Sequence, residues 1–165
     1  MFVNLFNVST PSAPFARFQD CKDLMALCDK FDCSSSIIQG VRARIKDLIP
    51  GRQWAVLIYA GERKDVELAV SVLNDMDTEH FLKNYRTYYR TTFGHRCVDV
   101  PPEDILKNTD YKDRMRMLPS SWQAILYDLC WSQEDRGFNE RNDQLSISDD
   151  WGVIAENFVL GDPEG

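Results

Sequence analysis

The sequence predicts a helix-rich α+β fold, with about six helices packed on a small sheet of two to four short strands. Apolar residues recur at helical spacing in several segments, and one unbroken apolar run is bounded by turn residues. At 165 residues, of which 44% are hydrophobic, the chain is long enough to bury a core. We therefore expect a single domain over residues 1–165.

Strands are expected where aromatic and β-branched residues cluster between turns. Residues 1–8, "MFVNLFNV", fit this description. Residues 53–61, "QWAVLIYAG", form a continuous apolar run, which is typical of a strand buried on both faces. Shorter extended pieces are expected at residues 97–100, "CVDV", and 145–148, "LSIS".

Helices are expected where apolar residues are spaced three and four positions apart. Serine, threonine and aspartate precede several of these segments and are suited to cap them. The predicted helices cover residues 15–31, 34–49, 63–76, 77–94, 119–132 and 149–160.

The formal charge of −7 is unevenly distributed. Residues 1–131 form a neutral body, with equal numbers of acidic and basic residues. Residues 132–165 contain nine acidic residues and two basic ones. We divide this part into a polar loop, residues 132–145, and an acidic C-terminal segment, residues 146–165. Because residues 133–144 have almost no apolar anchor, we expect them to form the most mobile internal segment.

The cysteines and the apolar segments predict an intracellular, reducing, cytoplasmic setting. The five cysteines are odd in number, and Cys21, Cys28 and Cys130 fall on apolar helical faces, so we expect these three to be reduced and buried. The N-terminal residues lack the basic and apolar regions of a secretory signal. No apolar run approaches the roughly 20 residues of a membrane span, so no membrane association is expected.

No catalytic residues and no cofactor are predicted, because the sequence has no nucleophile elbow, phosphate loop or dinucleotide fingerprint. Zinc has one candidate set, Cys28, Cys33, His95 and Cys97, which supplies three thiolates and an imidazole. The spacing is looser than that of established zinc motifs, and core cysteines are the alternative explanation.

The segment 80–96 is basic and rich in tyrosine within an acidic chain. If it is helical, Lys83, Arg86 and Arg90 share one face, with Tyr89 beside them and Arg96 beyond. This face could bind an acidic protein surface or nucleic-acid phosphates. Alternatively, it is solvated, or the chain's own acidic segment covers it.

The last predicted helix is a second candidate for docking. Trp151, Ile154 and Phe158 follow the spacing of anchors that insert into a partner's groove. A terminal helix that closes its own core would show the same pattern.

These observations favour a non-enzymatic protein–protein interaction module that docks a charged partner. Inhibitors, immunity proteins, adaptors and viral or phage antagonists of a host factor are of this type. The alternative is a nucleic-acid-binding protein that uses the basic, tyrosine-rich helix, and the third hypothesis is an enzyme with an unfamiliar site.

Overall fold

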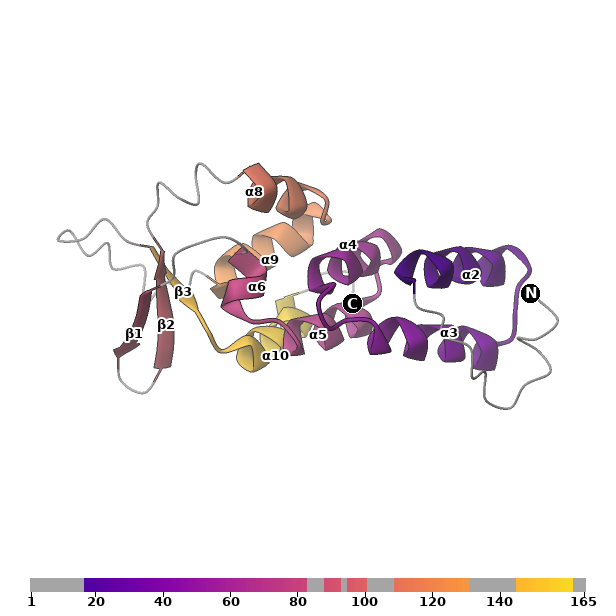
Figure 1. Ribbon diagram of the computed structural model, residues 1–165, viewed down its shortest axis with the longest axis horizontal. Helices are drawn as coiled ribbons and strands as arrows, with labels where there is room; N and C mark the ends of the chain where they lie inside the picture. Colours follow the sequence, from indigo (N-terminus) through magenta and orange to yellow (C-terminus); the bar gives the residue numbers. More distant parts are fainter. Residues whose placement is uncertain (1–16, 83–87, 93–94, 101–108, 131–144, 162–165) are drawn as a thin grey trace. The chain divides into compact units, whose positions relative to one another are not determined.

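The computed structural model describes residues 17–82, 88–92, 95–100, 109–130 and 145–161 (Figure 1). The strand expected at residues 1–8 and the loop expected to be mobile at 133–144 lie outside these residues. The chain forms two compact units, Met1–Leu48 and Ile49–Gly165, and each is treated separately below. That the whole chain folds as one domain stays a prediction.

The first unit contains two helices that pack against each other, α2 (Phe18–Lys30) and α3 (Ser35–Asp47). Both were predicted from their apolar spacing. The buried side chains recur at intervals of three and four residues, so each helix has one apolar stripe. These side chains are Cys21, Met25 and Cys28 on α2, and Val41 and Ile45 on α3.

The second unit is built mainly from helices. In chain order, the helices among its described residues are α4 (Gln53–Arg63), α5 (Val66–Asn74), α6 (Thr78–Leu82), α8 (Thr109–Arg116), α9 (Ser120–Cys130) and α10 (Trp151–Gly161). Helix α5 packs against α4 and α10, and α9 packs against α8 and α10. The helix-rich character of the prediction is therefore confirmed. None of the described helices is both long and apolar enough to cross a membrane.

The strand predicted at residues 53–61 is wrong, because this segment forms α4. The helix is buried around most of its circumference, including Trp54, Val56 and Leu57, with Ala55 exposed on the remaining side. A helix that is apolar on nearly all sides gives the same continuous run as a buried strand, so periodicity could not separate the two. The helix ends at Arg63, and the next residue, Lys64, adopts the left-handed conformation common just past a helix end.

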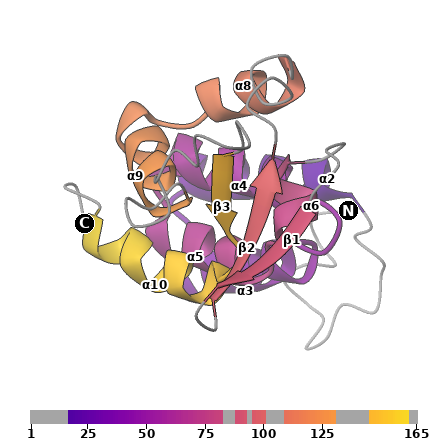
Figure 2. The same ribbon diagram turned by 90° about the vertical axis from the view of Figure 1, so that its left-hand side faces the viewer.

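A three-stranded antiparallel sheet has the order β1 (Tyr88–Thr92), β2 (His95–Val100) and β3 (Leu145–Ser148). Strands β2 and β3 coincide with the two short extended pieces expected from the sequence. The arrangement predicted for the helices, packed on a small sheet, is not supported. They pack chiefly on one another, and among the strands it is β3 that contacts α9 (Figure 2).

Four aromatic side chains join four helices of the second unit. Phe81 of α6 stacks on Trp54 of α4 at a centroid distance of 5.1 Å, and the Trp54 indole N–H donates to the Phe81 carbonyl at 3.0 Å. The Phe81 ring also meets Tyr111 of α8 at 5.5 Å and Trp151 of α10 at 4.7 Å. None of the surface of Phe81 is exposed. This aromatic cluster holds the short helix α6 in the core.

Gly61 is where α4 approaches the start of α9. A Cβ atom at Gly61 would lie 2.6 Å from Pro119 Cδ, and the proline ring has little freedom to move away. We expect Gly61→Ala to lower the free energy of unfolding by about 1–3 kcal/mol, because overpacking outweighs the better helix propensity of alanine.

Gly40 of α3 is the matched control for Gly61. An added Cβ there meets nothing within 4 Å, so Gly40→Ala should stabilise the protein by up to about 1 kcal/mol. Denaturant unfolding of both variants measures the difference. Equal stabilisation by the two substitutions would show that α4 and α9 are not closely packed at this point.

Candidate interaction surface

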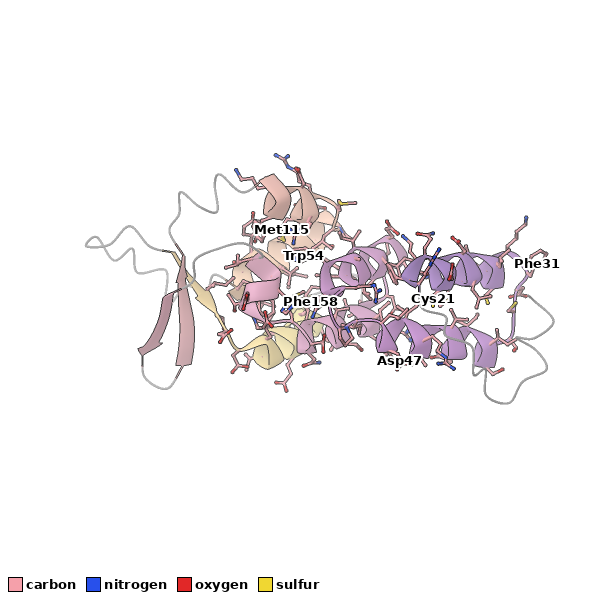
Figure 3. All side chains as sticks on the ribbon, viewed as in Figure 1. Cys21, Phe31, Asp47, Trp54, Met115 and Phe158 are labelled. Atoms are coloured by element: carbon pink, nitrogen blue, oxygen red, sulfur yellow. The ribbon has the colours of Figure 1, made fainter. Side chains whose placement is uncertain are left out.

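The inward face of α10 is occupied by the residues predicted to dock a partner. Trp151, Ile154 and Phe158 are all buried, and Phe158 meets the Trp122 ring of α9 edge-on at 5.1 Å. This burial fits the alternative explanation, a terminal helix that closes its own core, and a docking role for these three residues stays a prediction. They close the chain's own core, because α10 packs on α5 and α9 (Figure 3).

The first turn of α10 is fixed by a polar network at its N-terminus. The Thr78 hydroxyl donates to Asp149 Oδ1 at 2.7 Å and accepts from the Trp151 indole N–H at 3.1 Å. Asp150 caps the helix, since its Oδ1 accepts from the backbone N–H of Val153 at 3.1 Å. The network ties α10 to α6, so its outward face is held on a rigid support.

The outward face of α10 is partly apolar. Val153 and Val159 are each 49% exposed, and Glu156 is exposed between them. At 100° per residue, these three positions lie within about 120° of one another around the helix axis. Tyr127 of the neighbouring helix α9 is also exposed. Exposed apolar side chains that project from a well-packed helix can contact a second protein.

The charges of α5, α9 and α10 are all acidic. None of these helices contains lysine or arginine, and Asp149 and Asp150 directly precede α10. The charged residues within the helices are Glu67 of α5, Asp128 of α9 and Glu156 of α10, and all three are exposed. We call the exposed residues of these helices the acidic surface. Its sign would attract a partner that carries lysine or arginine.

The acidic surface was only partly visible in the sequence. The excess of acids after residue 132 was evident, but Glu67 and Asp128 lie in the part that was read as a neutral body. They join the acidic C-terminal helix only because α5 and α9 pack on α10. A missed signal was the absence of lysine and arginine from residues 65–82 and 117–135.

The helix predicted at residues 77–94 is confirmed at its start, where α6 forms, and is wrong at residues 88–92. Helix α6 ends at Leu82, and residues 88–92 form β1, which pairs with β2. Tyrosine and threonine, which make up four of these five residues, favour strands. The shared face that helical spacing gave to Lys83, Arg86 and Arg90 therefore does not exist as predicted.

The predicted basic residues are distributed differently along the structure. Tyr89 and Arg90 lie on β1, opposite Val98 and Cys97, and Arg96 lies on β2, opposite Thr91. Lys83 and Arg86, like Tyr85, lie outside the described residues. That Lys83, Arg86, Tyr89, Arg90 and Arg96 bind a partner stays a prediction.

The cysteines agree with expectation where their side chains are described. Cys21, Cys28 and Cys130 are buried, free thiols, as predicted. Burial raises the pKa of each of these thiols, so they are protonated at neutral pH.

The candidate zinc set is divided between the two units. Cys28 and Cys33 belong to the first, whereas His95 and Cys97 lie on β2 in the second. Among the residues whose side chains the structure describes, no three histidine, cysteine or acidic side chains lie together as metal ligands would.

Asp77 and His80 form the clearest pair of titratable side chains in the described part of the second unit. His80 Nδ1 lies 2.6 Å from Asp77 Oδ2, and the His80 backbone N–H donates to Asp77 Oδ1 at 2.6 Å. The second bond is that of a helix cap, which explains why Asp77 lies at the start of α6. Both side chains are exposed, and capping accounts for the geometry without a catalytic role.

No family model matches the chain, and comparisons with curated proteins and with solved structures likewise found no match.

Proposed function

We propose that the protein is a non-enzymatic interaction module that binds a protein partner with a basic surface. The observation that carries the proposal is the acidic surface, which combines three packed helices without lysine or arginine and the exposed Val153 and Val159. Acidic residues around apolar contacts suit a partner that presents lysine or arginine around apolar side chains of its own. Inhibitors, immunity proteins, adaptors and antagonists of a host factor bind in this way.

The alternative of nucleic-acid binding has less support. It depended on a helical face shared by Lys83, Arg86 and Arg90, and the chain forms β1 where part of that helix was expected. An acidic surface also repels phosphate, so α5, α9 and α10 do not suit a nucleic-acid interface.

The test compares two charge reversals of equal size. Glu156→Lys changes the acidic surface, whereas Asp47→Lys changes an exposed position at the end of α3 in the other unit (Figure 3). The tagged wild-type chain and both variants are used to capture partners from a native lysate, with and without nuclease. Captured proteins are identified, and their affinities are measured with purified components over a range of salt concentrations.

We expect Glu156→Lys to weaken binding by roughly tenfold and to flatten its dependence on salt, because attraction becomes repulsion. Asp47→Lys should leave the affinity within about twofold, since Asp47 belongs to the other unit and is not a residue of the acidic surface. Both variants should keep their melting temperature, because exposed substitutions change stability by about 0.5 kcal/mol or less. Equal binding by both variants would refute the acidic surface as the binding site, and capture that disappears with nuclease would support the nucleic-acid alternative.

A further inference from the structure

Helix α2 ends in a cap that places two cysteines together. The backbone N–H of Cys33 donates to the carbonyl of Cys28 at 3.0 Å, closing a loop of six residues. Asp32, between them, has φ of 46°, in the left-handed region. This combination is the Schellman arrangement, in which the side chains at the two ends of the six-residue loop commonly touch. Here those two side chains are the thiols.

The two thiols differ in accessibility. Cys28 is 2% exposed, whereas Cys33 is partly exposed to solvent. The six-residue loop closed between Cys28 and Cys33 brings the two side chains to the same end of α2, and a contact between the thiols contributes to the raised pKa of Cys28. Burial, followed by this contact and the nearby charge of Asp29, raises the pKa of Cys28. An oxidant in solution therefore meets Cys33 first.

We propose that Cys28 and Cys33 form a reversible intramolecular disulfide, which makes the end of α2 a redox-sensitive site. The oxidant is a small disulfide such as oxidised glutathione. The Cys33 thiolate attacks one sulfur of the oxidant, which releases one thiolate and leaves a mixed disulfide at Cys33. Cys28 then loses its proton to solvent and attacks the Cys33 sulfur, which releases the second thiolate. The two cysteines give up two electrons, and the small disulfide becomes two thiols.

Of the other cysteines whose side chains the structure describes, Cys21 and Cys130, neither is placed to pair with Cys33 or Cys28 in this way. Cys21 precedes Cys28 by seven residues on the same helix, which is about 10 Å along the axis and beyond the reach of a disulfide. Cys130 is completely buried in the second unit. The disulfide would lock the turn that presents Phe31, which is 65% exposed (Figure 3). Oxidation would therefore restrain the backbone of the turn that carries this exposed aromatic side chain.

The test uses the full chain, fully reduced and then equilibrated with buffers of increasing ratio of oxidised to reduced glutathione. After acid quenching and alkylation, mass spectrometry of intact protein and peptides identifies each cysteine's state. We expect loss of two hydrogens, with a peptide link between Cys28 and Cys33 that reduced glutathione reverses. Cys21→Ala is the control and should form the same link at the same ratio.

Two variants test the order of the steps. In Cys28→Ser, oxidation should stop at the mixed disulfide between glutathione and Cys33. In Cys33→Ser, Cys28 should stay unmodified at the same ratio of oxidised to reduced glutathione. Circular dichroism melting verifies that each variant is folded, and Cys28→Ala replaces Cys28→Ser if the buried hydroxyl prevents folding. The proposal is overturned if the wild-type chain also stops at glutathione on Cys33, if Cys33 links to another cysteine, or if the pair stays reduced at the most oxidising ratio.

Discussion

Replacing Phe81 with alanine should lower the free energy of unfolding by about 3–5 kcal/mol, the range observed when a buried phenylalanine is truncated. The ring has no exposed surface and touches aromatic side chains from three other helices. Its removal leaves a cavity among rigid rings, which cannot collapse to fill it. The loss also includes the favourable geometry of the aromatic pairs, about 0.5–1.5 kcal/mol each beyond burial.

Phe31→Ala is the control for this prediction. Phe31 is strongly exposed at the end of α2, so the same substitution should change stability by about 0.5 kcal/mol or less. Urea or guanidinium unfolding, followed by tryptophan fluorescence, measures both variants. Similar small losses for the two would show that α6 is not held by the aromatic cluster, since a truly buried ring cannot be removed without cost.

Helices with one apolar stripe could be predicted from the sequence. Cys21, Met25 and Cys28 of α2 recur at intervals of four and three, and the structure buries these positions. The same reasoning failed for α4, where Trp54, Val56 and Leu57 are buried together and leave no polar side to reveal the helical period. Tertiary packing around the whole circumference of α4 is information that a short sequence window does not contain.

The candidate site was harder to predict than the helices. Helical spacing suggested a docking stripe that begins at Trp151, but a stripe that binds a partner and a stripe that closes the core have the same pattern. Only the packing of α10 on α5 and α9 shows that the stripe faces inward. The acidic surface likewise depends on bringing Glu67, Asp128 and Glu156 onto neighbouring helices, although they are far apart in sequence.

The prediction that the basic residues share one helical face was wrong for a different reason. Residues 77–94 were predicted to form one helix, in which Lys83, Arg86 and Arg90 would share a face. Tyr88–Thr92 instead pairs with the neighbouring strand β2, with Thr92 opposite His95, and its tyrosine and threonine residues favour a strand over the helix that charge spacing suggested.

Removing the Thr78 hydroxyl should lower the free energy of unfolding substantially, although the group is small. It is 1% exposed, donates to Asp149 and accepts from the Trp151 indole N–H. Thr78→Val keeps the shape of the side chain but leaves the buried indole N–H and one carboxylate oxygen without this partner. We expect a loss of about 2–3 kcal/mol, because unsatisfied buried polar groups cost more than the net value of the hydrogen bonds removed.

Two further variants separate the hydroxyl from the methyl group at this position. Thr78→Ser keeps the hydroxyl and removes one methyl, so it should cost only about 1 kcal/mol, less than valine. Ser71→Ala removes a hydroxyl whose bond is to the Glu67 carbonyl on the solvent side of α5, and its effect should be about 0.5 kcal/mol or less.

Denaturant unfolding measures the loss of unfolding free energy in the three variants, and the order of these losses shows whether Thr78 stabilises the protein through its hydroxyl or its methyl group. If Thr78→Val loses more stability than Thr78→Ser, and Ser71→Ala stays near wild type, the polar network fixes α10 to α6. If Thr78→Ser instead loses more stability than Thr78→Val, the packing of the methyl group stabilises the protein and the polar network does not. Because the network fixes the first turn of α10, Thr78→Val should also weaken partner binding, although Thr78 itself is buried and is not a residue of the acidic surface.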